Sequence, residues 1–213
     1  MKTYLTEFIG TFFLVLTIGL SVLSGSPLAP LAIGAALMVM VYMGGHISGA
    51  HYNPAVTVAV WIRGKLPASQ VVPYWISQIL GSLAAAFVVH ILTGRTFAPA
   101  PSPETSSLQA LIAEILYTFA LALVVLNVAT ARATEGNSYY GLAIGFTVMA
   151  GAFAAGPVSG GAFNPAVGLG PIVIESVMGG GGFGNLWLYL AGPLAGAAAA
   201  AMVFNLQHAG AAD

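Results

Sequence analysis

The sequence predicts an all-α membrane protein with six transmembrane helices and two re-entrant half-helices, arranged as an inverted repeat. Three observations lead to this fold class. First, 58% of the 213 residues are hydrophobic and only 5% are charged, which is far less charge than the surface of a soluble domain carries. Second, the apolar residues fall into stretches long enough to cross a bilayer. Third, one short motif containing Asn, Pro and Ala occurs twice, at residues 48–56 and 159–167.

Six apolar stretches are expected to span the membrane. A hydrocarbon core of about 30 Å needs about 20 helical residues, and modest tilt accommodates stretches of somewhat different length. Polar residues, Pro and Gly separate the stretches, and the Pro-rich segment 99–103 marks the middle of the chain. The predicted spans are residues 4–23, 28–43, 71–93, 108–128, 139–155 and 186–206.

Each copy of the repeated motif has the residues of a helix start. Asn53 and Asn164 stand at the expected N-cap, and a Pro follows each one at the first helical position, where its fixed φ suits a helix. The stretch from Asn53 to Arg63 holds only eleven residues, roughly 16 Å of helix or half of the hydrocarbon core. Two half-helices that meet head to head are therefore expected to form one site at the bilayer midplane.

The two halves of the chain align with each other. Asn53 corresponds to Asn164 and Glu7 to Glu114. The offset between the halves changes only in loops, where insertions cost least. We therefore interpret the chain as a single domain with two internal repeats, with bounds at 1–213 for the domain and at about 1–96 and 108–207 for the repeats.

Each half carries an odd number of spans, so the second half must enter the membrane from the opposite face. The result is an inverted repeat, and such repeats place the working site near the midplane. Basic residues concentrate on the cytoplasmic side of membrane proteins. Both termini of this integral membrane protein are therefore expected in the cytoplasm, with a plasma or inner cell membrane as its site. This puts four of the five basic residues inside, namely Lys2, Arg63, Lys65 and Arg132, and leaves Arg95 outside.

The first apolar stretch also has the length of a secretory signal peptide, with Lys2 ahead of it. Glu7 interrupts that stretch, and the residues Glu7, Thr11 and Phe12 recur at the corresponding positions of the second half. A removable leader has no reason to be copied inside the mature chain. We therefore interpret this stretch as the first span.

The composition argues against several functions. The sequence has no cysteine, which removes disulfides, thiolate metal sites and thiol nucleophiles. The net charge of −1 gives no sign of nucleic-acid binding. His46 and His51 lie beside the first motif without a third ligand-type residue, so no metal or other cofactor is expected. An intramembrane enzyme needs a nucleophile with a paired base, and the spacing provides none, so we expect no catalytic residues.

The residues around both motifs resemble those of the aquaporins and glycerol facilitators. Residues 45–57 are very similar to the first Asn-Pro-Ala loop of that family, and residues 164–166 look like the second. The Glu residues of the first and fourth spans, and Tyr74 and Trp75 with Gln78, also match. The resemblance covers nearly the whole chain. It implies an aquaporin-like fold, assembled as a homotetramer in a lipid bilayer, that works as a passive channel for water and small neutral solutes.

The resemblance implies that the two motifs line the middle of a pore. The N-terminus of each half-helix carries about half a positive charge, so that two together repel cations. The Asn side chains can donate amide N–H groups to a passing oxygen, which the resemblance implies breaks a proton-carrying chain of waters. Non-helical carbonyls at residues 45–50 and 156–161 are expected to form a polar ladder. The motif residues are Asn53, Pro54, Ala55, Asn164, Pro165 and Ala166.

Four ionisable side chains near the motifs are expected to support the loops. Carboxylates inside a membrane are functional candidates by default, and a proton relay is one interpretation. The resemblance implies instead that Glu7 and Glu114 accept backbone N–H groups and fix the re-entrant loops. We expect His46 and His51 to brace the loop or line the pore, with pH-dependent gating as the alternative.

In the family that this sequence resembles, a ring of residues on the extracellular side of the pore sets solute selectivity. It commonly includes an Arg directly after the second Asn-Pro-Ala. Val167 stands there in this sequence, as in the plant vacuolar type, which removes five N–H donors and a fixed positive charge. A wider, apolar ring suits ammonia, urea, hydrogen peroxide or small polyols alongside water. An apolar constriction can also lose its water and close, so the alternative is a closed-pore structural or sensory membrane protein of the same fold. The predicted filter is Ile33, Ala152, Gly161 and Val167.

Overall fold

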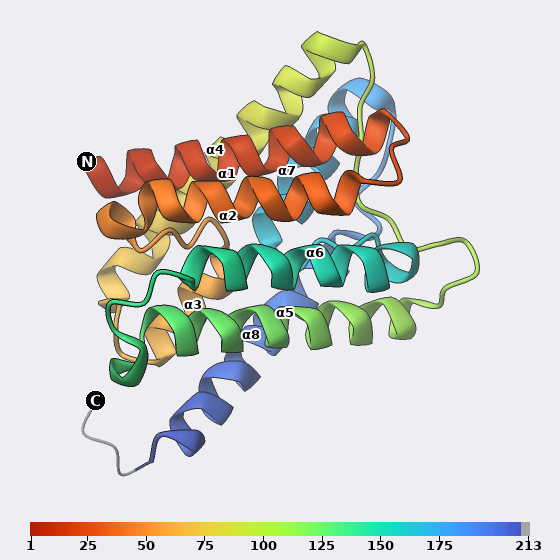
Figure 1. Cartoon of the computed structure of the whole chain (residues 1–213). Coiled ribbons are helices and arrows are strands. Elements are labelled where there is room, and N and C mark those ends of the chain that lie inside the picture. Colours follow the sequence, from red (N-terminus) through yellow and green to blue (C-terminus); the bar gives the residue numbers. More distant parts are fainter. Residues whose placement is uncertain (210–213) are drawn as a thin grey trace.

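The computed structural model describes residues 1–209, which form an all-helical bundle (Figure 1). Six of its helices are long and apolar enough to cross a membrane, which confirms the predicted fold class. These helices are α1 (Lys2–Leu23), α2 (Ala29–Ser48), α4 (Ala68–Thr93), α5 (Ser107–Ala129), α6 (Tyr140–Ser159) and α8 (Leu186–Gln207).

Two shorter helices follow the repeated motifs. Helix α3 (Pro54–Ile62) has 9 residues and α7 (Pro165–Ile174) has 10, so each is about half as long as a spanning helix. Helix α7 continues into a π-helical turn at Glu175–Gly179, and a short 3₁₀ turn lies at Arg132–Thr134. In Figure 1 the half-helices α3 and α7 lie among the long helices, and they contact each other.

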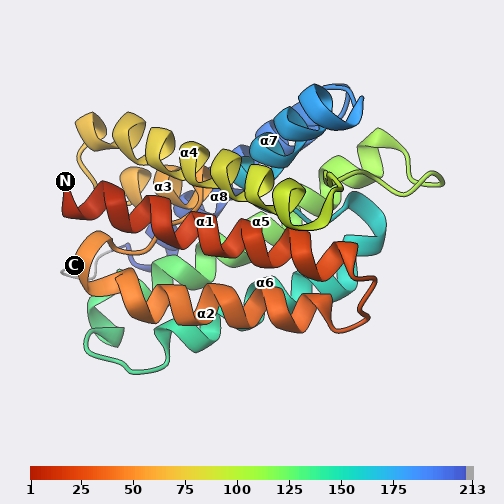
Figure 2. The same cartoon turned by 90° about the horizontal axis from the view of Figure 1, so that it is seen from above.

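Each half-helix packs on a long helix from the other half of the chain. Helix α3 contacts α8, and α7 contacts α4. Within the halves, α1 packs on α4 and α5 packs on α8, whereas α2 and α6 pack on each other across the halves. Figure 2 shows α1 beside α2 and α4 beside α7. The same packing pattern occurs in both halves, as an inverted repeat requires.

Glycines let the long helices approach closely where they cross. A Cβ atom on Gly34 of α2 would lie 2.7 Å from the carbonyl oxygen of Gly145 on α6. A Cβ atom on Gly81 of α4 would lie 2.5 Å from the backbone of α1, and one on Gly196 of α8 would overlap the backbone of α5. Small residues at such crossings supply the close van der Waals contact that holds helices together in lipid. Larger residues at these positions would separate the helices that carry the motif loops.

Two spans end later than the sequence predicts. Helix α2 continues to Ser48 rather than to residue 43, and α6 continues to Ser159 rather than to residue 155. Gly49 and Gly160 then end these helices in the left-handed conformation, with φ values of 83° and 89°. The expectation of non-helical backbone was therefore wrong for residues 45–48 and 156–159, whereas residues 49–50 and 160–161 are non-helical. These Gly-rich turns stay helical because glycine is tolerated in membrane helices whose neighbours pack against them.

The outside and the ends of the bundle fit a membrane protein. Large apolar side chains are exposed on the outer faces of the long helices, where lipid tails replace water as the neighbour. The start of α1 and the end of α8 lie at the same end of the bundle in Figures 1 and 2. An even number of spans requires this. Exposed side chains that represent this surface include Leu5, Phe13, Val72, Ile91, Leu116 and Met202.

Candidate functional site

One buried carboxylate holds the loop before α3 in a strained conformation. Ala50 and Tyr52 have φ values of 51° and 48°, in the left-handed region that costs a non-glycine residue roughly 1–2 kcal/mol. Glu7 on α1 is fully buried and accepts a hydrogen bond from the hydroxyl of Ser48 at 2.7 Å. It also accepts the backbone N–H groups of His51 at 2.9 Å and Tyr52 at 2.7 Å. These bonds stabilise a turn that the backbone alone would disfavour.

The loop before α7 is held in the same way by the corresponding carboxylate of the second half. Phe163 has a φ of 49°. Glu114 on α5 is fully buried and accepts a hydrogen bond from the hydroxyl of Ser159 at 2.7 Å. It also accepts the backbone N–H groups of Ala162 at 3.0 Å and Phe163 at 2.7 Å. The two carboxylates therefore hold the two loops through equivalent donors.

A tyrosine from the following long helix closes each loop. The hydroxyl of Tyr74 on α4 donates to the carbonyl oxygen of Ser48 at 2.6 Å, and that of Tyr189 on α8 donates to the carbonyl oxygen of Ser159 at 2.6 Å. The sequence analysis noted Tyr74 only as part of the family resemblance, although Tyr189 stands at the corresponding position of the second half. Their repetition was the available signal, because a buried tyrosine hydroxyl needs a hydrogen-bond partner.

The two motif asparagines are each bonded to the loop of the other half. The Oδ1 atom of each asparagine accepts the backbone N–H two residues later, at 2.8 Å for Asn53 and 2.9 Å for Asn164, so both are N-caps. The Nδ2 group of Asn53 donates to the carbonyl oxygen of Phe163, and that of Asn164 donates to the carbonyl oxygen of Tyr52, both at 2.9 Å. Each Nδ2 group keeps one N–H for another acceptor. The caps were expected, whereas the reciprocal bonds were not.

The N-termini of α3 and α7 meet at this pair of reciprocal bonds. Each asparagine that starts one half-helix bonds to the residue just before the other half-helix begins. The aligned peptide dipoles give each N-terminus about half a positive charge. The centre of the molecule therefore combines a positive potential with amide donors, which favours a neutral oxygen atom over a cation.

A cavity of about 380 Å³ reaches this centre. Asn53 and Asn164 both lie in its wall, and most of the remaining wall is apolar. Helix α2, helix α6, the second motif loop and helix α7 each contribute one residue of the predicted filter to the same wall. These residues are Ile33, Ala152, Gly161 and Val167.

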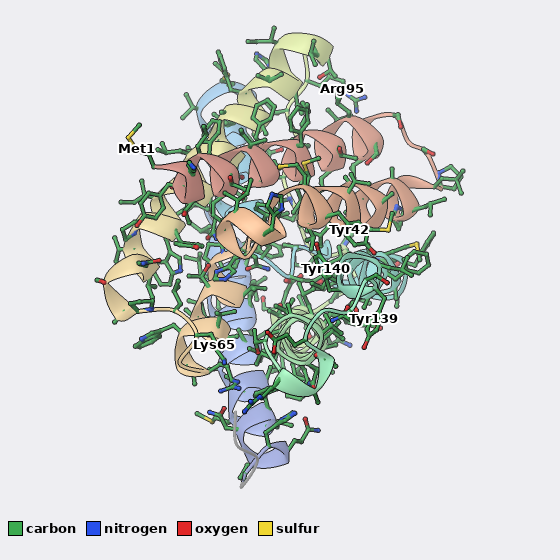
Figure 3. All side chains as sticks on the ribbon, turned by 60° about the vertical axis from the view of Figure 1, so that its left-hand side comes forward. Met1, Tyr42, Lys65, Arg95, Tyr139 and Tyr140 are labelled. Atoms are coloured by element: carbon green, nitrogen blue, oxygen red, sulfur yellow. The ribbon has the colours of Figure 1, made fainter. Side chains whose placement is uncertain are left out.

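A second cavity of about 680 Å³ lies at the end of the bundle where α2 ends and α6 begins. Ile144 on α6 lines both cavities, so the two meet at this residue. Figure 3 shows Tyr140 near Tyr42, and their ring centres are 5.2 Å apart. Unlike the first cavity, the second has Lys, Arg and Glu side chains in its wall, and the charged and polar residues there include His46, Lys65, Arg132, Glu135 and Asn137.

The two histidines near the first motif have different surroundings. His51 is buried, its Nδ1 atom lies 3.1 Å from the hydroxyl of Thr57, and its ring centre lies 4.8 Å from that of Tyr74. It also lines the first cavity. His46 does not lie in the loop that it was expected to brace, since it is exposed, belongs to α2 and lines the second cavity, which leaves the alternative that it lines the pore. The continuation of α2 to Ser48 explains this, because it keeps His46 on a helix instead of in the loop.

Gln78 on α4 gives the first half a support that the second half lacks. Its Nε2 group donates to the Glu7 carboxylate at 2.8 Å and to the hydroxyl of Thr57 at 3.0 Å. Pro193 occupies the corresponding position of the second half, and its side chain has no donor. The carboxylate of the first half therefore accepts one more hydrogen bond than that of the second.

The fold and this site define a membrane channel. The structure has six helices of spanning length, and four of them, α1, α2, α5 and α6, line a cavity that the N-termini of two half-helices reach. The sequence model of one family, the major intrinsic proteins, matches residues 1–204. The chain belongs to the major intrinsic protein family, which confirms its resemblance to the aquaporins and glycerol facilitators.

Named relatives and a solved structure agree with this family. The chain is 38% identical to Aquaporin NIP1-4 of Oryza sativa subsp. japonica over 97% of this chain and 77% of that relative. It is also 38% identical to Probable aquaporin NIP4-2 of Arabidopsis thaliana, over 96% of this chain and 74% of that relative. The X-ray structure of the aquaglyceroporin from Plasmodium falciparum has the same fold, with a TM-score of 0.85 and 22% identity over 96% of this chain and 95% of that one.

These findings fix the class of the protein. It is an integral membrane protein and a passive channel for water and small solutes, not an enzyme. Both relatives are named as NIP aquaporins. Val167 had instead suggested a resemblance to the plant vacuolar type.

Proposed function

We propose that the chain conducts water together with small neutral solutes, among them ammonia, urea, hydrogen peroxide and small polyols, and that it excludes ions and protons. One observation carries this proposal. The two motif asparagines share a cavity with an apolar ring in which Val167 takes the place of a cationic side chain. A neutral solute can pass such a wall at low cost, whereas an ion would lose its hydration without replacement.

Cation exclusion rests on the two half-helix N-termini. Together they carry roughly one positive charge. Against a cation about 5 Å away, at an effective dielectric constant of about 20, this is a barrier on the order of 3 kcal/mol before any loss of hydration. The side chains of Ile33, Val56 and Val167 in the cavity wall have no oxygen atoms that could replace hydrating water. Charge and desolvation therefore act in the same direction.

Proton exclusion rests on the orientation of the two asparagine amides. Their oxygen atoms are occupied by the N–H groups of their own half-helices. Only the Nδ2 groups of Asn53 and Asn164 remain to bind a passing water, and they act as donors. A water that accepts from both must point its own hydrogens away from the pair. Proton transfer along a chain of waters is interrupted at that water.

The wide range of proposed solutes depends on the small, uncharged side chains of the filter. Ala152 and Gly161 are both partly exposed to the cavity, and Val167 presents only methyl groups. Loss of an Arg side chain widens the ring and removes its directional donors. The named relatives are aquaporins and the structural neighbour is an aquaglyceroporin. Water and glycerol therefore belong among the test solutes.

We place both termini in the cytoplasm, with the chain in a plasma or inner cell membrane as a homotetramer. The shared location of the start of α1 and the end of α8 supports a common side (Figure 2). Lys65 and Arg132 line the cavity at that same end, in agreement with the excess of basic residues in cytoplasmic loops. The exposed apolar side chains of the outer surface supply contact area for lipid and for neighbouring copies.

Stopped-flow light scattering of proteoliposomes tests the solute proposal. Vesicles are first shrunk in an impermeant osmolyte and are then followed as they re-swell in urea or glycerol. We expect wild type to pass water and urea, and Val167→Arg to lose urea flux by about tenfold while keeping water flux, since a guanidinium narrows the ring. Equal urea flux in wild type and Val167→Arg would contradict the assignment of the filter.

A closed pore is the second candidate, and the boundary between the two cavities at Ile144 favours it. Apolar constrictions can exclude water and thereby block conduction. A structural or sensory protein of this fold would assemble normally in vesicles. It would give water and urea permeabilities equal to those of vesicles without protein.

A further inference from the structure

The predicted filter has a counterpart at the other side of the asparagines. The offset of 111 residues that relates Asn53 to Asn164 also relates four further pairs of positions. We call the predicted filter the outer ring and its counterpart the inner ring. Ile33, Ala152, Gly161 and Val167 form the outer ring, and their respective counterparts Ile144, Val41, Ala50 and Val56 form the inner ring.

The structure places the inner ring where the two cavities meet. Ile144 lines both cavities, Val41 lines the larger one, and Ala50 and Val56 line the one that contains the asparagines. Neighbouring residues of α2 and α5 show the same division. Leu37 and Val125 line the first cavity, whereas Val41 and Val128, about one helical turn further on, line the second.

The inner ring is bulkier than the outer ring. Both contain one Ile and one Val at corresponding positions, but Val41 replaces Ala152 and Ala50 replaces Gly161. The side chains of the inner ring therefore hold three more carbon atoms in total. Val41 is 2% exposed and Ala50 6% exposed, whereas Ala152 and Gly161 are partly exposed. At corresponding backbone positions, the side chains of the inner ring therefore occupy more space than those of the outer ring.

We propose that the inner ring, with Val41 as its decisive residue, sets the size limit for solutes that pass this chain. The proposal rests on the proposed function, since a size limit exists only for a conducting pore. A solute that passes the small side chains of the outer ring meets the narrower inner ring on its way between the cavities. The inner-ring residues Val41 and Ile144 then determine which solutes are small enough to pass. The outer ring affects solute selectivity mainly because it carries no charge.

The polar side chain of His51 lies beside the inner ring, so the narrow level of the pore is not lined by apolar side chains alone. His51 lines the cavity next to Ala50, and Ala162 occupies the corresponding position in the other half. The Nδ1 atom of His51 lies 3.1 Å from the hydroxyl of Thr57, and the residue lines the cavity that contains the asparagines. The imidazole can thus offer its second nitrogen to a solute at the narrow level. A narrow ring with a polar partner restricts size while allowing small polar molecules to enter.

An exchange of side chains between the rings tests this inference. Val41→Ala gives the inner ring the outer residue, Ala152→Val does the reverse, and Val39→Ala on the exposed face of α2 is the matched control. The readout is the permeability ratio of methylurea to urea in proteoliposomes, with water flux recorded in parallel. We expect Val41→Ala to raise this ratio by about tenfold, on the scale of methyl-group discrimination in tight sites. Ala152→Val and Val39→Ala should change it by less than about twofold.

The outcomes separate this inference from the function on which it rests. If Ala152→Val lowers the ratio while Val41→Ala leaves it unchanged, the outer ring sets the size limit and the inference is overturned, although the channel function stands. If wild type passes no solute and Val41→Ala opens it, the inner ring is confirmed as the limiting constriction. Size-exclusion chromatography shows whether each variant is folded. If wild type and all variants are folded but give the same permeabilities as empty vesicles, both the inference and the proposed function fail.

Discussion

The loops before α3 and α7 make the same backbone contacts with different side chains around them. In each loop a buried Glu accepts a Ser hydroxyl and two backbone N–H groups, and a Tyr hydroxyl binds the carbonyl of that Ser. The first loop adds a layer of polar side chains where the second has residues without polar side-chain atoms. The first-half residues are His51, Thr57 and Gln78, and the corresponding second-half residues are Ala162, Gly168 and Pro193.

This difference separates what the fold requires from what one half adds. The contacts common to both loops hold left-handed residues before a helix start, so they are needed wherever a half-helix enters the membrane. The polar layer occurs on one side only, so the fold does not need it twice. It brings His51 into the cavity wall, whereas the second half presents the methyl group of Ala162 there. The comparison therefore predicts unequal responses to matched substitutions.

The largest expected effect is the loss of a bracing carboxylate. Glu7→Ala removes four hydrogen bonds and Glu114→Ala removes three, and the Ser159 hydroxyl of the second loop also has the carbonyl oxygen of Ala155 as an acceptor at 3.4 Å. At roughly 1–3 kcal/mol for each buried unpaired group, we expect losses of unfolding free energy of about 4 kcal/mol or more for Glu7→Ala and about 3 kcal/mol for Glu114→Ala. Thermal unfolding in detergent measures the order. Glu104→Ala, at an exposed position, is the control. A larger loss for Glu114→Ala than for Glu7→Ala would contradict the expected difference between the two loops.

The next effect concerns Gly168, which corresponds to Thr57. A Cβ atom on Gly168 would overlap the Cβ atom of Tyr189, so Gly168→Ala must displace the tyrosine that closes the second loop. We expect a loss of about 1–3 kcal/mol, the usual cost of overpacking. The midpoint of thermal unfolding measures it, and Gly182→Ala, where a Cβ would meet nothing within 4 Å, is the control. An unchanged midpoint for Gly168→Ala would show that the second loop can accept the side-chain size of the first.

The smallest effect is expected for the extra donor of the first half. Gln78→Leu removes the bonds to Glu7 and Thr57, but it also removes the buried Oε1 atom of Gln78, which has no partner. These contributions oppose each other, so the unfolding free energy should fall by only about 1 kcal/mol. Gln70→Leu, at a partly exposed position of the same helix, is the control. A loss as large as that of Glu7→Ala would mean that the polar layer is a structural requirement of the first loop.

Much of the fold could be predicted because its signals are local. Runs of apolar residues located all six spans, and the Asn-Pro pairs located the starts of α3 and α7. The ends of α2 and α6 were placed four or five residues too early because Gly-rich turns lower the hydropathy without ending the helix. Packing against neighbouring helices decides that outcome, and a window of sequence does not contain it.

The site was predictable where the repeat carried the information. Asn53 and Asn164 were found from the repeated motif, and the four outer-ring residues were taken from the family resemblance by their spacing to that motif; all of them line one cavity. The reciprocal bonds between the asparagines and the opposite loops depend on the distance between segments 110 residues apart, so they needed coordinates. His46 was assigned to the loop instead of to α2 for the same reason that the end of α2 was placed too early.

Parallel flux measurements on wild-type proteoliposomes show whether the paired asparagines and half-helix N-termini form a pathway that conducts neutral solutes and excludes charge. Urea re-swelling is followed by light scattering, and proton entry is followed by a pH-sensitive dye sealed inside the same vesicles. We expect urea flux well above that of empty vesicles and proton flux equal to that of empty vesicles. Proton flux above the empty-vesicle value, or urea flux no greater than it, would show that the pore does not select neutral solutes over charge.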